Sequence, residues 1–482
     1  MKQFRMMLLS LAILPFVRVA IAAEKSASSK PAADAKLEVI ELAIRPALPP
    51  RLALKHSLLP GYLERTPGNA VPVYAKAFTW LGVSSSGEKW DKICEWLDTP
   101  LESLPREEVR ETVEGYSEAL GYVDIAARRE RCDWDAPVRE EGENVFGILL
   151  PEVQSARSAA RLVALRARLQ IAEKDYDEAV ASLRTGYAMA RHVAEQPFFI
   201  SGLVGMSIVG IMNGQLQAML AQPDVPNMYW AITALPHPMI DVRPSLEFEA
   251  AAVYLMFPEM EPSKRCDLSP TEWSAVVPKA LSTFAELDRR LRDGKSATAG
   301  EKEGFVTKAL KALPHAKADL IAAGHPKEKV EAMAPGEAVL LDVFEIFEQR
   351  RDDLVKWLNV PYWQAREGMK EAEARIATSS KSPELTSPAN ALLALVDNDY
   401  AAEARSERAL AALRCVEAIR LYAAAHGGKL PATLDEIREV PIPINPVTGG
   451  AFGYRLEGEV AVLDADGPPG EYRRQYRVSV VK

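Results

Sequence analysis

The feature that most constrains the fold of this chain is a helical hairpin predicted at residues 152–195. Apolar residues recur every three or four positions in both of its arms, which is the spacing of one helix face. They are Leu162, Leu165, Leu169 and Ala172 in the first arm, and Ala179, Leu183, Tyr187, Ala190 and Ala194 in the second. Small residues such as Ala167 and Gly186 would let the arms approach closely. We therefore expect further helices to stack on this pair.

The same periodicity predicts which side chains lie inside. We expect Leu165 and Leu183 to pack in the core, and Arg168, on a different face, to point outward. Residues 173–175 break the pattern between the arms. Because a carboxylate at a helix start accepts hydrogen bonds from free backbone amides, we expect Asp177 to cap the second arm.

Residues 198–220 follow the hairpin and are nearly all apolar as far as Met212. One interpretation is a membrane-spanning helix, since Gly210 and Gly214 have the spacing of a helix-packing motif. Polar residues then interrupt the run before it reaches the roughly 20 residues of a span. They are Asn213, Gln215 and Gln217. We predict a buried core helix whose glycines allow close packing.

The N-terminus has the pattern of a secretory signal peptide. Lys2 and Arg5 precede an apolar run that extends through Val17, and Ala20 and Ala22 form a small-x-small cleavage site. An uncleaved membrane anchor is the alternative, but the run is too short for a span of roughly 20 residues. We expect cleavage after Ala22 or Ala23, and export to the periplasm or beyond the cell, with no stable membrane span afterwards.

Composition limits the class of partner. The chain has 482 residues, 48% of them hydrophobic, so it can bury a sizeable core. Its net charge is −9, which argues against nucleic acid as the main partner. Four cysteines would permit three pairings that the sequence does not distinguish. They are Cys94, Cys132, Cys266 and Cys415.

These patterns together predict a mainly α chain, with a large irregular body of stacked helical hairpins and a small C-terminal α+β domain. The same patterns divide the chain into five segments. They are a signal peptide at 1–22, a flexible leader with a short extended segment at 23–68, a helical domain at 69–376, a polar linker at 377–387, and the α+β domain at 388–482. In the last of these we expect a helix at 401–426 and three short strands, at 453–456, 460–463 and 476–481.

The C-terminal segment resembles the soluble part of type II secretion pseudopilins. The resemblance rests on five short motifs, IRLY at 419–422, HGGKLP at 426–431, LDEI at 434–437, Asn445-Pro446 and Ala465-Asp466-Gly467. It implies a long helix packed on a small sheet, and a loop near Ala465 that binds calcium in some members. Residues 175–183 resemble the second half of a tetratricopeptide repeat. The whole arrangement is similar to exported, mostly helical bacterial proteins of unassigned function.

The sequence contains no catalytic motif that we would assign. The six histidines are scattered without metal-ligand spacing, and there is no Gly-rich phosphate loop. Ser86 and Lys89 match S-x-x-K but lack the companion motifs of penicillin-binding proteins. We therefore predict no catalytic or cofactor-binding residues.

Asp464 and Asp466 form a carboxylate pair on a predicted loop. With Glu471 and a backbone carbonyl they could hold Ca²⁺, which prefers oxygen ligands. A plain Asp-Gly turn is the alternative. The sequence-based hypothesis for function is a non-enzymatic scaffold or envelope-assembly protein with a protein partner in the cell envelope. The alternative is an envelope hydrolase whose site is assembled from scattered residues.

Overall fold

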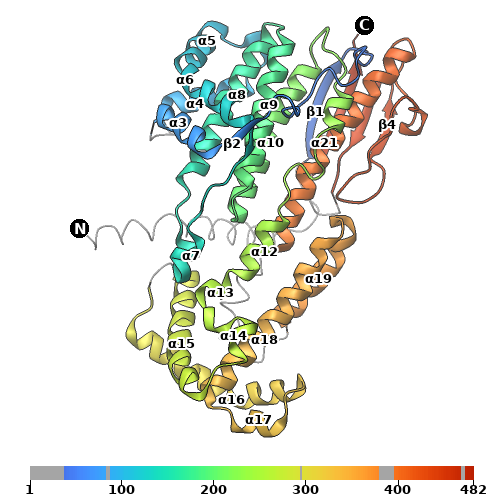
Figure 1. The fold of residues 1–482 in the computed structure, drawn as a ribbon. Coiled ribbons are helices and arrows are strands. Elements are labelled where there is room, and N and C mark those ends of the chain that lie inside the picture. Colours follow the sequence, from blue (N-terminus) through green and yellow to red (C-terminus); the bar gives the residue numbers. More distant parts are fainter. Residues whose placement is uncertain (1–36, 83–86, 294–295, 379–395, 468–472, 482) are drawn as a thin grey trace. The chain divides into compact units, whose positions relative to one another are not determined.

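The computed structural model describes residues 37–82, 87–293, 296–378, 396–467 and 473–481 (Figure 1). It is 64% helical and 8% strand, which confirms the predicted mainly α class with a small sheet. The predicted signal peptide at 1–22, the leader as far as residue 36 and the linker from residue 379 lie outside the described residues.

The chain divides into two compact units that do not follow the predicted boundaries. The mixed unit, which holds helices and a four-stranded sheet, comprises Pro31–Ala136, Leu150–Ser245 and Tyr400–Lys482. The helical unit includes Pro137–Leu149 and Leu246–Asp399, and its described elements are all helices. The predicted helical domain at 69–376 is therefore split between two units, and the C-terminal segment joins one of them.

In the mixed unit, the predicted hairpin is present as α8 and α9, and α10 packs along both (Figure 1). Leu165 and Leu183 are both fully buried, as predicted. The cap of α9 is Asp175 rather than Asp177, because Asp175 Oδ1 accepts the Glu178 amide at 3.4 Å. The described helices are α3 (Val71–Leu81), α4 (Glu88–Asp98), α5 (Arg106–Gly115), α6 (Ser117–Ala127), α8 (Pro151–Ala172), α9 (Tyr176–Ala194), α10 (Phe199–Leu220), α11 (Tyr229–Thr233) and α21 (Val396–Ala425).

Arg168 does not point outward, so that prediction was wrong. Its side chain is 6% exposed, and Nη1 donates to Gln215 Oε1 at 2.9 Å. Nη2 donates to the carbonyl of Thr99, the residue that ends α4. Periodicity correctly gives α8 an apolar face, but neighbouring elements also cover the side of α8 that carries Arg168.

The sheet of the mixed unit joins the two ends of the sequence. Its strand order is β1-β6-β5-β4, with β1 parallel to β6 and the other neighbours antiparallel. The register of β1 on β6 runs from Leu37 opposite Arg473 to Ile44 opposite Val480. The strands are β1 (Leu37–Ile44), β4 (Gly453–Glu457), β5 (Val460–Asp464) and β6 (Arg473–Val480). β4, β5 and β6 were predicted as strands and β1 as a short extended segment, but the pairing of β1 with β6 was not predicted.

A second, two-stranded sheet was missed by the sequence analysis. β2 (Thr66–Asn69) pairs in parallel with β3 (Arg129–Arg131). Asn69 Oδ1 accepts the amides of Val71 at 3.2 Å and Asp133 at 2.9 Å. One side chain therefore serves both the start of α3 and the segment after β3.

The helical unit packs around aromatic rings. Phe257 stacks on Phe284 with ring centroids 4.5 Å apart, and Phe344 meets both rings edge-on. The chain passes from the mixed unit into the helical unit within α12 (Arg243–Ala251). The other described elements of the helical unit are α7 (Val138–Glu141), η2 (Gly142–Gly147), α13 (Val253–Met256), η3 (Pro258–Met260), α14 (Pro262–Arg265), α15 (Pro270–Asp293), α16 (Ala299–Ala322), α17 (Lys327–Ala332), α18 (Pro335–Val355), η4 (Lys356–Asn359) and α19 (Tyr362–Thr378).

Candidate functional site

The two carboxylates predicted to bind calcium lie at and just after the end of β5. Asp464 Oδ2 contacts Arg455 Nη1 at 2.5 Å, and its Oδ1 accepts from Gln475 Nε2 at 2.7 Å. Asp466 Oδ2 accepts from Arg473 Nε at 3.3 Å. Each carboxylate therefore already has a cationic partner, and a calcium ion would have to compete with these arginines.

Calcium binding at this end of β5 stays a prediction. Within the described residues, no group of three or more His, Cys, Asp or Glu side chains is arranged to hold a metal ion. Glu471, the third ligand that the sequence suggested, lies outside the described part of the chain. Asp466 Oδ1 is buried with no hydrogen-bond partner among the described residues, so Asp466 is the better placed of the two aspartates.

A buried polar cluster surrounds His192 in the mixed unit. His192 Nδ1 lies 3.0 Å from the hydroxyl of Tyr74, and burial lowers the pKa of His192 to about 4. Nearby, burial raises the pKa of Cys132 well above its usual range, so its thiol stays protonated and is a poor nucleophile. Tyr74 is fully buried and Cys132 only 2% exposed, which indicates that the cluster holds α3 and α9 together.

Glu403 on α21 is a titrating group that the sequence analysis missed. Burial raises the pKa of Glu403 to about 7, with the nearby Asp241 and Glu407 adding to the shift. Its Oε2 accepts the Val242 amide at 2.9 Å. A pKa near neutrality suits a general acid or base, but this carboxyl is 7% exposed and is held by backbone. Sequence spacing alone could not reveal the burial that causes the shift.

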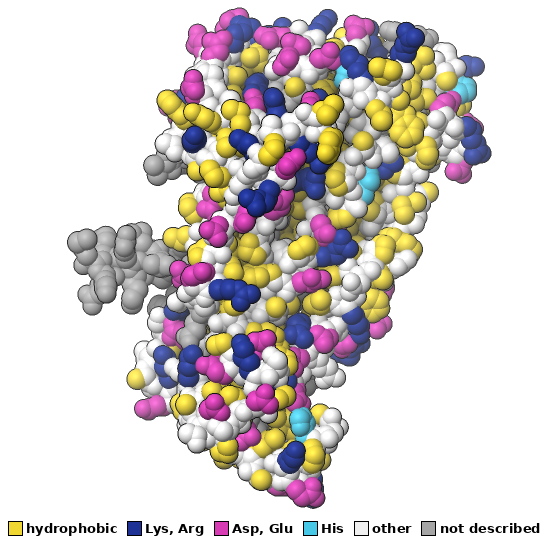
Figure 2. Space-filling model, in the orientation of Figure 1, with side chains coloured by type: hydrophobic (Ala, Val, Ile, Leu, Met, Phe, Trp, Pro, Cys, Tyr) yellow, Lys and Arg dark blue, Asp and Glu magenta, His cyan; other side chains and the backbone are white. Residues whose placement is uncertain are grey.

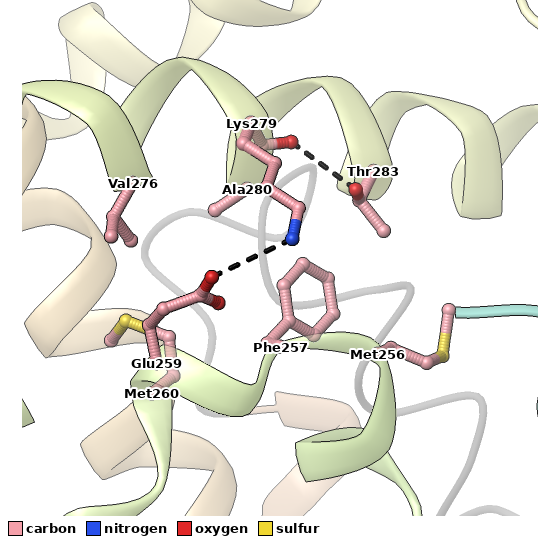
Figure 3. Close-up of a pocket in the computed structure, with 8 residues that line it drawn as sticks. All are labelled: Met256, Phe257, Glu259, Met260, Val276, Lys279, Ala280 and Thr283. Atoms are coloured by element: carbon pink, nitrogen blue, oxygen red, sulfur yellow. Dashed lines mark hydrogen bonds and ion pairs between the residues drawn. The ribbon is translucent and has the colours of Figure 1, made fainter. Parts of the chain in front are cut away.

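The helical unit contains a small hollow between α13, η3 and α15 (Figure 3). Its volume is ≈ 10 Å³, room for about one water molecule. Glu259 and Lys279 meet there at 3.5 Å, and the other lining side chains are mostly apolar. This hollow is too small to bind a substrate.

The candidate site that we favour is a strip on the surface of α10, which we call the seam. It consists of Ile200, Leu203, Ser207, Gly210 and Gly214. All five residues are exposed, with Ile200 at 37% and Leu203 at 36%. Their spacing alternates three and four residues, which places them on one face of the helix and matches the contact positions of paired helices. The seam carries no charge.

The glycines of this region show which faces of α10 are filled. A Cβ at Gly205 would come within 2.8 Å of the Ala190 carbonyl, and one at Gly186 would collide with the Met212 side chain, so both glycines allow the close packing of α9 on α10. At Gly210 and Gly214, by contrast, a Cβ would meet no described atom of another element within 4 Å. The seam is therefore the side of α10 on which close approach is still possible.

Among the described residues, α10 is also the helix long and apolar enough to span a membrane. Packing within the mixed unit buries 67% of the most apolar 18-residue stretch of α10. Asn213 on α10 accepts the buried Tyr187 hydroxyl at 2.6 Å, and Gln215 accepts from Arg168. Two of the three polar residues that interrupt the apolar run thus have partners on α9 and α8.

Comparison of the chain with family models, with curated proteins and with solved structures finds no match.

Proposed function

We propose that this chain is a non-enzymatic protein of the cell envelope that works as a helical scaffold and binds a protein partner along the seam. The observation that carries the proposal is the exposed, uncharged seam of α10, a helix whose other faces are packed. Exposed apolar strips of this kind mark protein interaction sites in soluble proteins. A partner helix is the natural occupant, because the alternating spacing and the two glycines would admit one at short distance.

Two sequence features support the envelope as the place of action. The first 22 residues have the pattern of a signal peptide, and the C-terminal segment resembles a secretion pseudopilin. The helix α21 and the antiparallel strands β4, β5 and β6 fall within this C-terminal segment (Figure 1). A role in assembling structures of the cell envelope is consistent with both features.

The mixed charge of the face shown in Figure 2 agrees with a protein partner rather than a nucleic acid. On the face shown in Figure 2, acidic and basic side chains are interspersed, with hydrophobic side chains between them. A nucleic-acid surface would instead gather Lys and Arg on one face.

An envelope hydrolase is the second candidate, and Glu403 is the observation that favours it. A carboxyl with a pKa of about 7 could move a proton at neutral pH. The Glu403→Gln variant separates the two functions, because it would abolish hydrolysis and leave partner binding along the seam unchanged.

The direct test of the scaffold proposal is site-specific photo-crosslinking from Ser207. Ser117, an exposed serine at the start of α6 in the same unit, is the matched control. A protein captured from Ser207 but not from Ser117, and lost when Gly210 is changed to Trp, would support the seam as the binding site.

A further inference from the structure

A second apolar surface lies in the mixed unit, on the loops between β1 and β2. Four large side chains there are among the most exposed in the described chain, and we call them the turn patch. Leu52 and Leu54 are each 72% exposed, Tyr62 is 86% exposed and Leu63 is 95% exposed. Isolated exposed leucines are ordinary on a protein surface, but four within twelve residues are not.

The turn patch is held by ordered turns. The Lys55 amide donates to the Leu52 carbonyl at 2.8 Å, which closes the first turn. In the second turn, the Glu64 amide donates to the Gly61 carbonyl at 3.0 Å, and the Gly61 amide returns a bond to Glu64 Oε2 at 2.7 Å. Between the turns, His56, Leu58 and Pro60 are buried and anchor the loop. The four apolar side chains are thus presented outward by a fixed backbone.

Both turns are fastened to the same helix, α9. Lys55 Nζ lies 3.4 Å from Asp177, and Glu64 pairs with Arg184. Arg184 Nε also donates to the Ser57 carbonyl at 3.2 Å. Asp177 and Arg184 are two turns apart on α9, a separation of about 10 Å along the helix axis.

The charge around the turn patch differs from that of the whole chain. Residues 45–65 contain four basic residues and one acid, whereas the whole chain has a net charge of −9. The basic residues are Arg45, Arg51, Lys55 and Arg65, and all four are exposed. Leucine and tyrosine tips flanked by Arg and Lys are suited to the surface of an anionic bilayer, where the apolar groups enter the headgroup region and the cations meet phosphate.

We propose that the turn patch docks the mixed unit onto an anionic phospholipid membrane surface. A second copy of this chain fits less well, since it would bring basic residues against basic residues. The proposal is independent of the seam, because it uses different residues and a lipid rather than a protein. On this proposal, the turn patch attaches the proposed scaffold to the membrane.

The test is vesicle flotation of the exported chain, purified after removal of its signal peptide. Vesicles of phosphatidylcholine alone are compared with vesicles containing phosphatidylglycerol. Wild-type protein should float with the anionic vesicles, and a fourfold variant with Leu52, Leu54, Tyr62 and Leu63 changed to Asp should lose about tenfold or more of that binding. The Arg51→Glu, Arg65→Glu double variant should also bind several-fold more weakly, and salt on the order of 0.5 M should reduce wild-type binding.

The control variant carries Ile444→Asp and Leu310→Asp, at side chains that are 55% and 49% exposed elsewhere on the surface. It should float like wild type, and the thermal transitions of all variants should match because every changed side chain is exposed. Equal flotation of wild type and the fourfold variant would overturn the proposal, as would equal binding to neutral and anionic vesicles. The proposal would also be overturned if the wild-type protein were a dimer and the fourfold variant a monomer, because the turn patch would then serve self-association.

Discussion

Glu417 and Arg420 lie one turn apart on α21 and form an ion pair inside the mixed unit, with Arg420 Nη1 2.7 Å from Glu417 Oε1. Both side chains are almost completely buried. Their other bonds reach distant parts of the sequence, because Arg420 donates to the carbonyls of Arg45 at 3.1 Å and Val225 at 3.0 Å. Glu417 also accepts the Met228 amide. The pair therefore ties α21 to both the N-terminal loop and the loop after α10.

Removing one member of this pair should strongly destabilise the protein. Glu417→Ala leaves the Arg420 guanidinium buried without its counter-charge, at a cost of about 3–5 kcal/mol in the free energy of unfolding. The matched control is Glu457→Ala, which breaks exposed ion pairs to Arg455 and Arg477 and should change stability little. Urea denaturation of both variants measures the difference. Similar losses in the two would mean that the buried pair is no more important than a surface one.

The same bonds lead us to predict that residues 388–482, which the sequence analysis gave as a separate domain, do not fold alone. An isolated fragment would lack β1, the strand paired along the whole of β6, and the carbonyl partners of Arg420. We expect it to show no cooperative thermal transition by circular dichroism. Fusing residues 37–45 to the fragment should recover part of the structure. A sharp transition in the unfused fragment would restore the predicted domain boundary.

Arg168 and Leu165 should both matter for stability. Leu165→Ala should cost about 2–5 kcal/mol through lost burial and a cavity. Arg168→Ala should cost about 2 kcal/mol or more, because it leaves the Gln215 side chain and the Thr99 carbonyl unpaired. Arg191 on the exposed side of α9 is the control, and its change to Ala should stay within about 0.5 kcal/mol. Chemical denaturation would contradict this packing if Arg168→Ala behaved like Arg191→Ala.

Glu403 should make stability depend on pH between about 4.5 and 7. Its pKa in the folded chain is raised to about 7 from 4.5, so folding favours the protonated carboxyl. This contribution is fully present below pH 4.5 and is lost as the pH rises toward 7. At pH 8, Glu403→Gln should therefore be more stable than wild type by about 1–3 kcal/mol, and at pH 5 the difference should shrink. Glu459→Gln, at an exposed position, is the control. Unfolding curves of wild type and both variants at the two pH values measure the difference in the free energy of unfolding.

Local patterns in the sequence predicted most helices and strands but few of the long-range contacts. The sequence indicated an extended segment near the N-terminus and a strand at 476–481, yet nothing local shows that these two strands pair, since pairing depends on how the whole chain folds back. For α8, periodicity identified the apolar face correctly and misjudged Arg168, because a long cation can be buried when a carbonyl and an amide lie within reach.

Neither the seam nor the buried ion pair could have been found from the sequence alone. Ile200, Leu203, Ser207, Gly210 and Gly214 alternate by three and four residues, a pattern visible without coordinates. Which face of an almost uniformly apolar helix stays exposed, however, depends on where α8 and α9 pack. The burial of Glu417 and Arg420 depends in the same way on loops distant in the sequence.

The measurement that tests the scaffold proposal most directly is photo-crosslinking in living cells, with a photoreactive residue in place of Ser207 or of the control Ser117. The account predicts that Ser207 captures one defined envelope protein, that Ser117 does not, and that adding Gly210→Trp abolishes capture while the thermal transition is unchanged. Capture that is equal from both serines, or that persists in the Gly210→Trp background, would contradict binding along the seam.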